Sequence, residues 1–108
     1  MSDLDYSDFF EQLFDKVMKP LWTSKNESYR NSWAGRTGAH GIFCQLERKT
    51  DRLFGSIWLG DLDDEKNISA ALDNLQDLAI YSMALYVELD SKRKKPSLDY
   101  SEEDGKNK

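Results

Sequence analysis

The chain of 108 residues carries 15 basic and 20 acidic side chains, a formal net charge of −5, and 39% hydrophobic residues. This length excludes a two-domain enzyme and predicts one small domain, whose modest core would gain from an oligomer partner. The net negative charge argues against duplex nucleic acid as a partner, because that affinity comes mainly from neutralising phosphates.

A wide apolar stripe predicts the first helix, over residues 6–23. Asp5 or Ser7 can cap its start. Pro20 lacks the N–H that the helical ladder needs, so it can kink or end this helix. Apolar pairs recur every four residues and so share one side of the helix; they are Phe9/Phe10, Leu13/Phe14, Val17/Met18 and Leu21/Trp22.

Residues 24–41 predict a long loop. They contain three of the six glycines and many small polar residues, with room for one helical turn around residues 29–33. A loop of this length is unusual in so small a domain and is often functional.

Apolar residues at helical spacing predict two more helices, at about 40–58 and 67–91. The acidic segment GDLDDEKN separates them, and the third helix should be the longest because no glycine or proline interrupts it. We expect residues 1–91 to form a single helical domain. Residues 92–108 are polar and lack an apolar period, which predicts a disordered tail.

The start of the chain and its single cysteine indicate the compartment. MSDLDYSDFF has acidic residues where a secretion signal has a basic and then an apolar run. No apolar stretch approaches the roughly 20 residues that span a bilayer, and one cysteine cannot form an internal disulfide. We therefore expect a cytoplasmic protein that does not contact a membrane.

Two pairs of carboxylates are spaced i, i+4 and so lie on one face of their helices. Glu47 pairs with Asp51, and Asp73 pairs with Asp77. If the two helices pack antiparallel, these four oxygen ligands could converge on Mg²⁺, which makes all four residues candidate metal ligands and catalytic groups. Alternatively, they are solvent-facing acids that form ion pairs with neighbouring cations. Those cations are Arg48, Lys49 and Arg52.

The predicted loop mixes cations, amides and aromatic rings. Such a mixture can stack on a base and meet a phosphate. Alternatively, Tyr29 and Trp33 anchor the loop to the core while polar side chains satisfy its backbone. The candidate ligand-binding residues are Lys25, Tyr29, Arg30, Trp33, Arg36, Lys49 and Arg52.

The single cysteine follows the single histidine by one helical turn. His40 and Cys44 could form a nucleophile with its base. However, Cys44 lies between Phe43 and Leu46 near the apolar face, which favours a buried structural cysteine. Because neither residue has a second copy, a zinc site is not expected.

Three segments together resemble a known family. They run from Lys25-Asn26 through Tyr29 to Ser32-Trp33, from Leu46 through Lys49 to Arg52-Leu53, and from Leu72-Asp73 through Asp77-Leu78-Ala79 to Met83-Ala84. They are similar to the "KN..DYG.SW", "DK..RL" and "LLDLANYA" motifs of the nucleotide modification associated domain of the first type. That family lies within the all-α MazG-like nucleoside triphosphate pyrophosphohydrolase superfamily.

The resemblance implies an oligomeric helical bundle that handles nucleotides, often encoded by bacteriophages, with Mg²⁺ held by carboxylates in the enzymes. By position, Asp77 matches the family's third-helix aspartate, and Lys49 and Arg52 match its second-helix basic pair. The chain departs from the motifs at several acidic, glycine or amide positions, which hold Ser28, Arg30, Arg48, Asn74 and Ile80. A site that lacks these acids and gains arginines could bind anionic nucleotides without cleaving them.

We therefore expect an all-α protein, a small antiparallel bundle of three main helices with room for a short extra helix, assembled as a homo-oligomer. Three functions are open. The protein could be a Mg²⁺-dependent pyrophosphohydrolase, a non-catalytic phage protein that sequesters a linear or cyclic nucleotide immune signal in the host cytoplasm, or a small acidic inhibitor of another protein. The first two share nucleotide binding.

Overall fold

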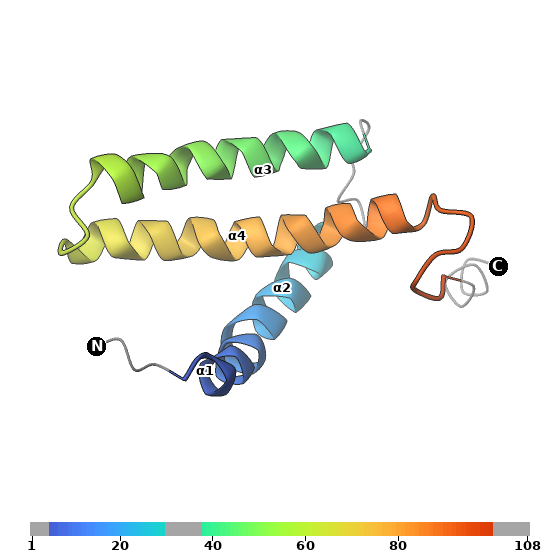
Figure 1. Ribbon diagram of the computed structural model, residues 1–108, viewed down its shortest axis with the longest axis horizontal. Helices are drawn as coiled ribbons and strands as arrows, with labels where there is room; N and C mark the ends of the chain where they lie inside the picture. The colour runs from blue at the N-terminus through green and yellow to red at the C-terminus, as the bar shows by residue number, and fades with distance from the viewer. Residues whose placement is uncertain (1–4, 30–37, 101–108) are drawn as a thin grey trace. The chain divides into compact units, whose positions relative to one another are not determined.

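The computed structural model describes residues 5–29 and 38–100. Within these ranges the regular structure is entirely helical and contains no strand (Figure 1). Three continuous helical stretches follow one another, which confirms the all-α class and the three main helices. They consist of α1 (Tyr6–Leu13), η1 (Phe14–Met18) and α2 (Lys19–Tyr29), then α3 (Ala39–Phe54) and η2 (Gly55–Leu59), then α4 (Glu65–Asp90).

The first helical stretch begins as expected and ends later than expected. The Asp5 carboxylate caps α1 by accepting hydrogen bonds from the Ser7 N–H at 3.2 Å and its hydroxyl at 2.7 Å. The helix continues past Pro20 to Tyr29, so the predicted end at residue 23 is wrong. The π-helical turn η1 precedes the proline, and local π geometry lets a helix absorb a residue that cannot donate.

The chain divides into two compact units, Met1–Trp33 and Ala34–Lys108. In the first unit, none of residues 5–25 is buried, and the aromatic side chains of the apolar stripe are exposed. Over the part of the chain that the structure describes, every helix is too short or too polar for a transmembrane span. The prediction of a single domain over residues 1–91 stays a prediction.

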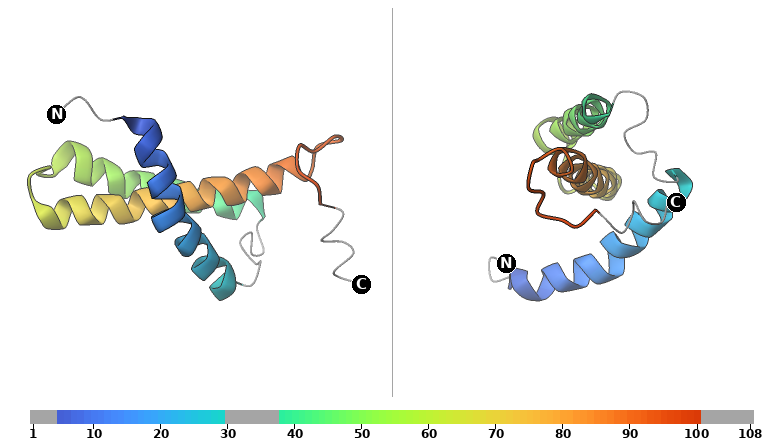
Figure 2. Two further views of the ribbon diagram at one scale, coloured as in Figure 1. Left: turned by 90° about the horizontal axis from the view of Figure 1, so that it is seen from below. Right: turned by 90° about the vertical axis from the view of Figure 1, so that its right-hand side faces the viewer.

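The second unit is built on a helical hairpin. Helices α3 and α4 run antiparallel and pack along their length (Figures 1 and 2). Ile42 from α3 and Ala71, Ile80 and Tyr81 from α4 are its buried apolar residues. This packing fixes which residues of the two helices face one another, and so positions the candidate site.

The connection between η2 and α4 is held by one side-chain amide. Asn67 Nδ2 donates to the carbonyl of Ser56 at 2.9 Å and to that of Asp61 at 3.0 Å. A Cβ at Gly60 would lie 2.7 Å from the Ser56 carbonyl oxygen, so only glycine fits there. The amide and the glycine together set the close approach of the two helices at this end.

Residues 91–100 fold back on the end of α4, and we call them the C-terminal strap. They contain turns, and their amides and side chains bond to Asp90. Up to residue 100 the structure therefore differs from the expected disordered tail, because a buried carboxylate supplies acceptors that hydropathy does not reveal. Residues 101–108 of the predicted tail lie outside the described residues.

Candidate functional site

An ion pair joins the two helices of the hairpin at the predicted site. Lys49 Nζ of α3 lies 2.8 Å from Asp77 Oδ2 of α4, and their side chains are 12% and 20% exposed. Lys49 follows Ile42 and Leu46 at the helical spacing of the side of α3 that faces α4. The pair thus occupies positions that packing alone would give to apolar residues.

A charged pair at this depth is not the most stabilising choice. Desolvating two charges offsets much of their attraction, and apolar residues of similar volume are often as stabilising or more so. Removing one partner is harmful, because the other charge is left without its counterion. Stability alone therefore gives little reason for a charged pair at the Lys49–Asp77 positions.

The three other candidate metal ligands lie at the surface. Glu47 and Asp51 are exposed on α3, and Asp73 is exposed on α4. Among the residues with described positions, no group of three or more His, Cys, Asp or Glu side chains is placed to hold a metal ion. As placed, the four carboxylates do not assemble around one point, and Asp77 lies against the Lys49 ammonium.

The candidate ligand-binding residues are divided between the two units. Lys25 is partly buried on α2, and Tyr29 is the last residue of that helix. Arg52 is exposed on α3, three residues after Lys49. The first six residues of the predicted loop, 24–29, are helical, which corrects the predicted start of that loop. Three of the candidates lie outside the described residues: Arg30, Trp33 and Arg36.

The prediction of a buried structural cysteine is wrong. Cys44 is exposed on α3, and His40 one turn earlier is exposed as well. Ile42, two residues before Cys44, is buried. Two residues turn a helix by about 200°, so Cys44 points to the opposite side. The prediction of burial relied on Phe43 and Leu46, which are close to Cys44 in sequence but point to other sides of the helix.

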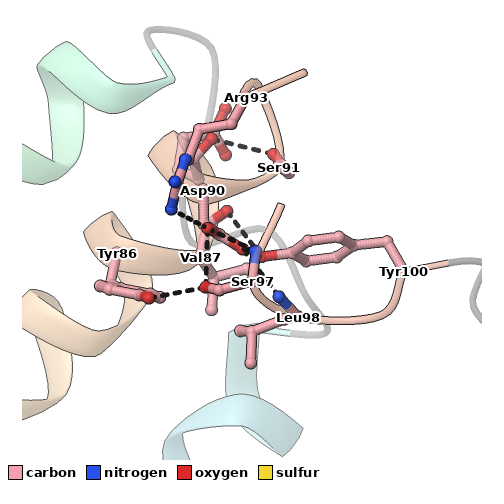
Figure 3. Close-up of polar contacts among 9 residues, drawn as sticks. Tyr86, Val87, Asp90, Ser91, Arg93, Ser97, Leu98 and Tyr100 are labelled. Carbon is pink, nitrogen blue, oxygen red and sulfur yellow. Dashed lines mark hydrogen bonds and ion pairs between the residues drawn. The ribbon is translucent and has the colours of Figure 1, made fainter. Parts of the chain in front are cut away.

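A second buried carboxylate, at the end of α4, was missed by the sequence analysis. Asp90 is only 3% exposed, and its oxygens accept hydrogen bonds from the strap (Figure 3). The backbone N–H groups of Ser97 and Leu98 donate at 3.0 to 3.1 Å, the Ser97 hydroxyl at 2.9 Å and the Tyr100 hydroxyl at 2.8 Å. Arg93 Nη1 adds an ion pair at 3.2 Å.

These contacts change the acidity of both ionisable partners. The backbone N–H of Ser97, with the other donors of the strap, holds the pKa of Asp90 well below its usual range despite burial. Burial, and then the hydrogen bond to Asp90, raise the pKa of Tyr100 to about 12. Tyr86 extends the cluster, because its hydroxyl lies 2.8 Å from Ser97 Oγ. We interpret Asp90 as a structural group whose acceptors are used within the chain.

No signal in the sequence was strong enough to find this cluster. Asp90 and Ser97 are seven residues apart and fit no cap or metal spacing. Comparison with models of protein families, with curated proteins and with solved structures finds no match to this chain. The hairpin and its Lys49–Asp77 pair are therefore the features of the molecule that bear on function.

Proposed function

We propose that the protein binds nucleotides through the Lys49–Asp77 site of the hairpin. The observation that carries this proposal is the partly buried ion pair between α3 and α4. The resemblance to the nucleotide modification associated domain adds support, since Lys49, Arg52 and Asp77 are the residues that match its basic pair and its aspartate. Binding takes place in the cytoplasm, in an infected host if the gene is carried by a phage.

The chemistry of Lys49 suits an anionic ligand. An ammonium group has three donors, and the contact with Asp77 Oδ2 at 2.8 Å occupies one of them. Asp77 thereby fixes the position of the ammonium, while the remaining hydrogens are available to phosphate oxygens. Arg52, exposed on the same helix, supplies a planar guanidinium that can bind a phosphate through two hydrogen bonds.

The base-stacking role predicted for Tyr29 and Trp33, and the phosphate contacts predicted for Lys25, Arg30 and Arg36, stay predictions from the sequence, and the proposal does not depend on them. An intact, sequestered nucleotide fits the site better than a hydrolysed one, because Asp77 faces an ammonium and no group of three carboxylates is placed for Mg²⁺ among the described side chains. Hydrolysis and inhibition of another protein remain the two outcomes that would replace this proposal.

The test is to incubate the purified protein with linear and cyclic nucleotides, with and without Mg²⁺. Mass spectrometry then examines the solution and the material released by denaturing the protein. We expect an intact nucleotide to be recovered from the protein without Mg²⁺. Products that form only with Mg²⁺ would indicate the pyrophosphohydrolase instead. The inhibitor hypothesis would gain if no nucleotide binds or raises the melting temperature, since a ligand selective for the folded state must stabilise it.

A matched pair of variants locates the binding site. Arg52→Gln removes an exposed charge of the proposed site, and Lys66→Gln removes an exposed charge at the start of α4. We expect Arg52→Gln to weaken nucleotide binding by roughly 10-fold or more, which is the scale of one hydrogen bond to a charged group. Lys66→Gln should bind as the unmodified protein does. Equal effects of the two variants would contradict the proposed site.

A further inference from the structure

Helix α4 carries an exposed apolar stripe that is symmetric in sequence about one small residue. Asp77 and Tyr81 lie on the side of α4 that is turned toward the hairpin interior, and the stripe lies on the opposite side. Its four large side chains are 46% to 53% exposed, and the alanine between them is exposed as well. The stripe consists of Leu72, Leu75, Ala79, Met83 and Tyr86.

The spacing of the stripe is the same in both directions from its centre. Leu75 and Met83 lie four residues before and after Ala79, and Leu72 and Tyr86 lie seven residues before and after it. A two-fold axis through Ala79 would therefore place Leu72 against the partner's Tyr86 and Leu75 against the partner's Met83 in an antiparallel pair. An interface of this kind is isologous, so the same patch serves both copies. The small central side chain allows the two helices to approach closely.

The charges at the two ends of α4 have opposite signs. Three exposed acids precede α4 and a fourth begins it, beside the exposed Lys66, whereas four exposed cations follow its end in the strap. An antiparallel pair brings each acidic end beside a basic end, whereas a parallel pair would bring like charges together. The acids are Asp61, Asp63, Asp64 and Glu65, and the cations are Lys92, Arg93, Lys94 and Lys95.

The strap gives these cations a defined place. Asp90 binds the strap on the far side of the cationic run, through the amides of Ser97 and Leu98 (Figure 3). Lys92 also pairs with Glu88 at 3.5 Å. The basic end is therefore an ordered turn beside the end of α4, and its position relative to the apolar stripe is fixed.

We propose that the stripe on α4 binds a second copy of this chain, antiparallel, with Ala79 at the two-fold axis and the acidic end of each α4 beside the basic end of the other. This gives the expected homo-oligomer a specific interface. The helix over residues 5–25 also has an apolar stripe, but covering α4 with it would leave the matched charges at the two ends without an explanation. The proposal is independent of nucleotide binding and is tested without a ligand.

The first test uses thiol cross-linking in a Cys44→Ser background, because Cys44 is itself exposed. Ala79→Cys lies on the proposed axis, so two copies should join under mild oxidation or with a short bifunctional thiol reagent. Met83→Cys is the control on the same stripe. Two copies of it would lie about 12 Å apart along the helices, from eight residues at 1.5 Å each, and should cross-link poorly. In an equal mixture of Met83→Cys with Leu75→Cys, the dimers that pair one variant with the other should cross-link, so the yield should approach half that of Ala79→Cys.

The second test uses charge reversal and sedimentation at low salt. Lys94→Glu combined with Lys95→Glu should weaken self-association severalfold, because acidic and basic ends would now repel. Adding Asp63→Lys and Asp64→Lys to the same chain should restore it. A monomeric protein whose Ala79→Cys variant does not cross-link would overturn the proposal, with the stripe covered by the chain's own helix or by another protein. An oligomer in which Met83→Cys cross-links as well as Ala79→Cys would overturn the proposed axis.

Discussion

Two partly or fully buried carboxylates on the same helix are neutralised in different ways. Asp77, in the middle of α4, meets the ammonium of Lys49 on the neighbouring helix at 2.8 Å. Asp90, at the end of α4, is surrounded by N–H and O–H donors from the strap that follows it, with Arg93 at its edge. Asp77 thus connects α3 and α4 through an ion pair. Asp90 instead holds the strap, residues 91–100, against the end of α4 through hydrogen bonds.

The difference indicates which carboxylate can serve a ligand. The backbone N–H groups of Ser97 and Leu98 use their hydrogens on Asp90, so this carboxylate stabilises the end of α4 and the strap that follows. The Lys49 ammonium has further hydrogens beside the one directed at Asp77, and a phosphate can share it with that carboxylate. The partners of a buried carboxylate, and not its burial alone, therefore indicate whether it can take part in binding a ligand.

The largest effect should come from removing the cation of the inter-helix pair. Lys49→Met removes the ammonium beside the partly buried Asp77 carboxylate, so the free energy of unfolding should fall by about 2 kcal/mol, below the range for fully buried pairs because both groups are partly exposed. Urea unfolding measures this. Lys66→Met, at an exposed position, is the control and should change little.

A double substitution then separates a structural pair from one kept for function. Lys49→Met with Asp77→Leu replaces both charges by apolar groups and should recover most of the lost stability. The recovered protein should still bind nucleotides poorly. If it binds as well as the unmodified chain, the pair is structural and the proposed site is elsewhere.

Most of the fold was predictable because it depends on helical periodicity. The apolar spacing located the second and third helices to within a few residues of α3 with η2 and of α4. The first helix was predicted six residues too short, because Pro20 was given its usual effect. A proline near the start of a helical turn is tolerated, and the π turn before it could not be recognised from residue types.

The candidate site was predictable only in part. Lys49 and Asp77 were named from motif and spacing, and the structure places them in contact. The other carboxylates were named on spacing alone, which fixes a shared helix face but not whether that face meets the other helix. The residues of the Asp90 cluster follow no regular spacing in the sequence. Tertiary hydrogen bonds, and not helical periodicity, hold the strap against the end of α4.

The next effect should be confined to the strap. Asp90→Asn removes the negative charge and one of the two acceptor oxygens, so the remaining amide oxygen accepts more weakly and the hydrogen bonds from the Ser97 and Leu98 N–H groups should weaken. Amide hydrogen exchange of these two residues should become faster by about 10-fold or more, while the amides of α3 keep their protection. Asp63→Asn is the same chemical change at an exposed position and should leave the strap unaffected.

The pH dependence of the same bonds gives a second reading of this region. Because folding lowers the pKa of Asp90 below its ordinary value of 3.8, its contribution is fully present above that value and is lost only as the pH falls through the lower folded pKa. The strap should therefore stay closed from pH 7 to pH 4. Unprotected Ser97 and Leu98 amides at pH 4, after correction for intrinsic exchange, would show that Asp90 does not hold it.

The smallest effect concerns one phenol. Burial and the hydrogen bond to Asp90 raise the pKa of Tyr100 to about 12 from an ordinary value of 10.0. A raised pKa means that this hydroxyl stabilises the strap fully below pH 10 and loses that effect as the pH rises through about 12. The difference between the tyrosinate absorbance titrations of the unmodified protein and of Tyr100→Phe isolates this group. In an Asp90→Asn background the same difference should shift toward pH 10, whereas in Asp63→Asn it should stay near 12. If the pKa of Tyr100 is unchanged by Asp90→Asn, burial alone raises it, and the carboxylate at the end of α4 does not organise the strap.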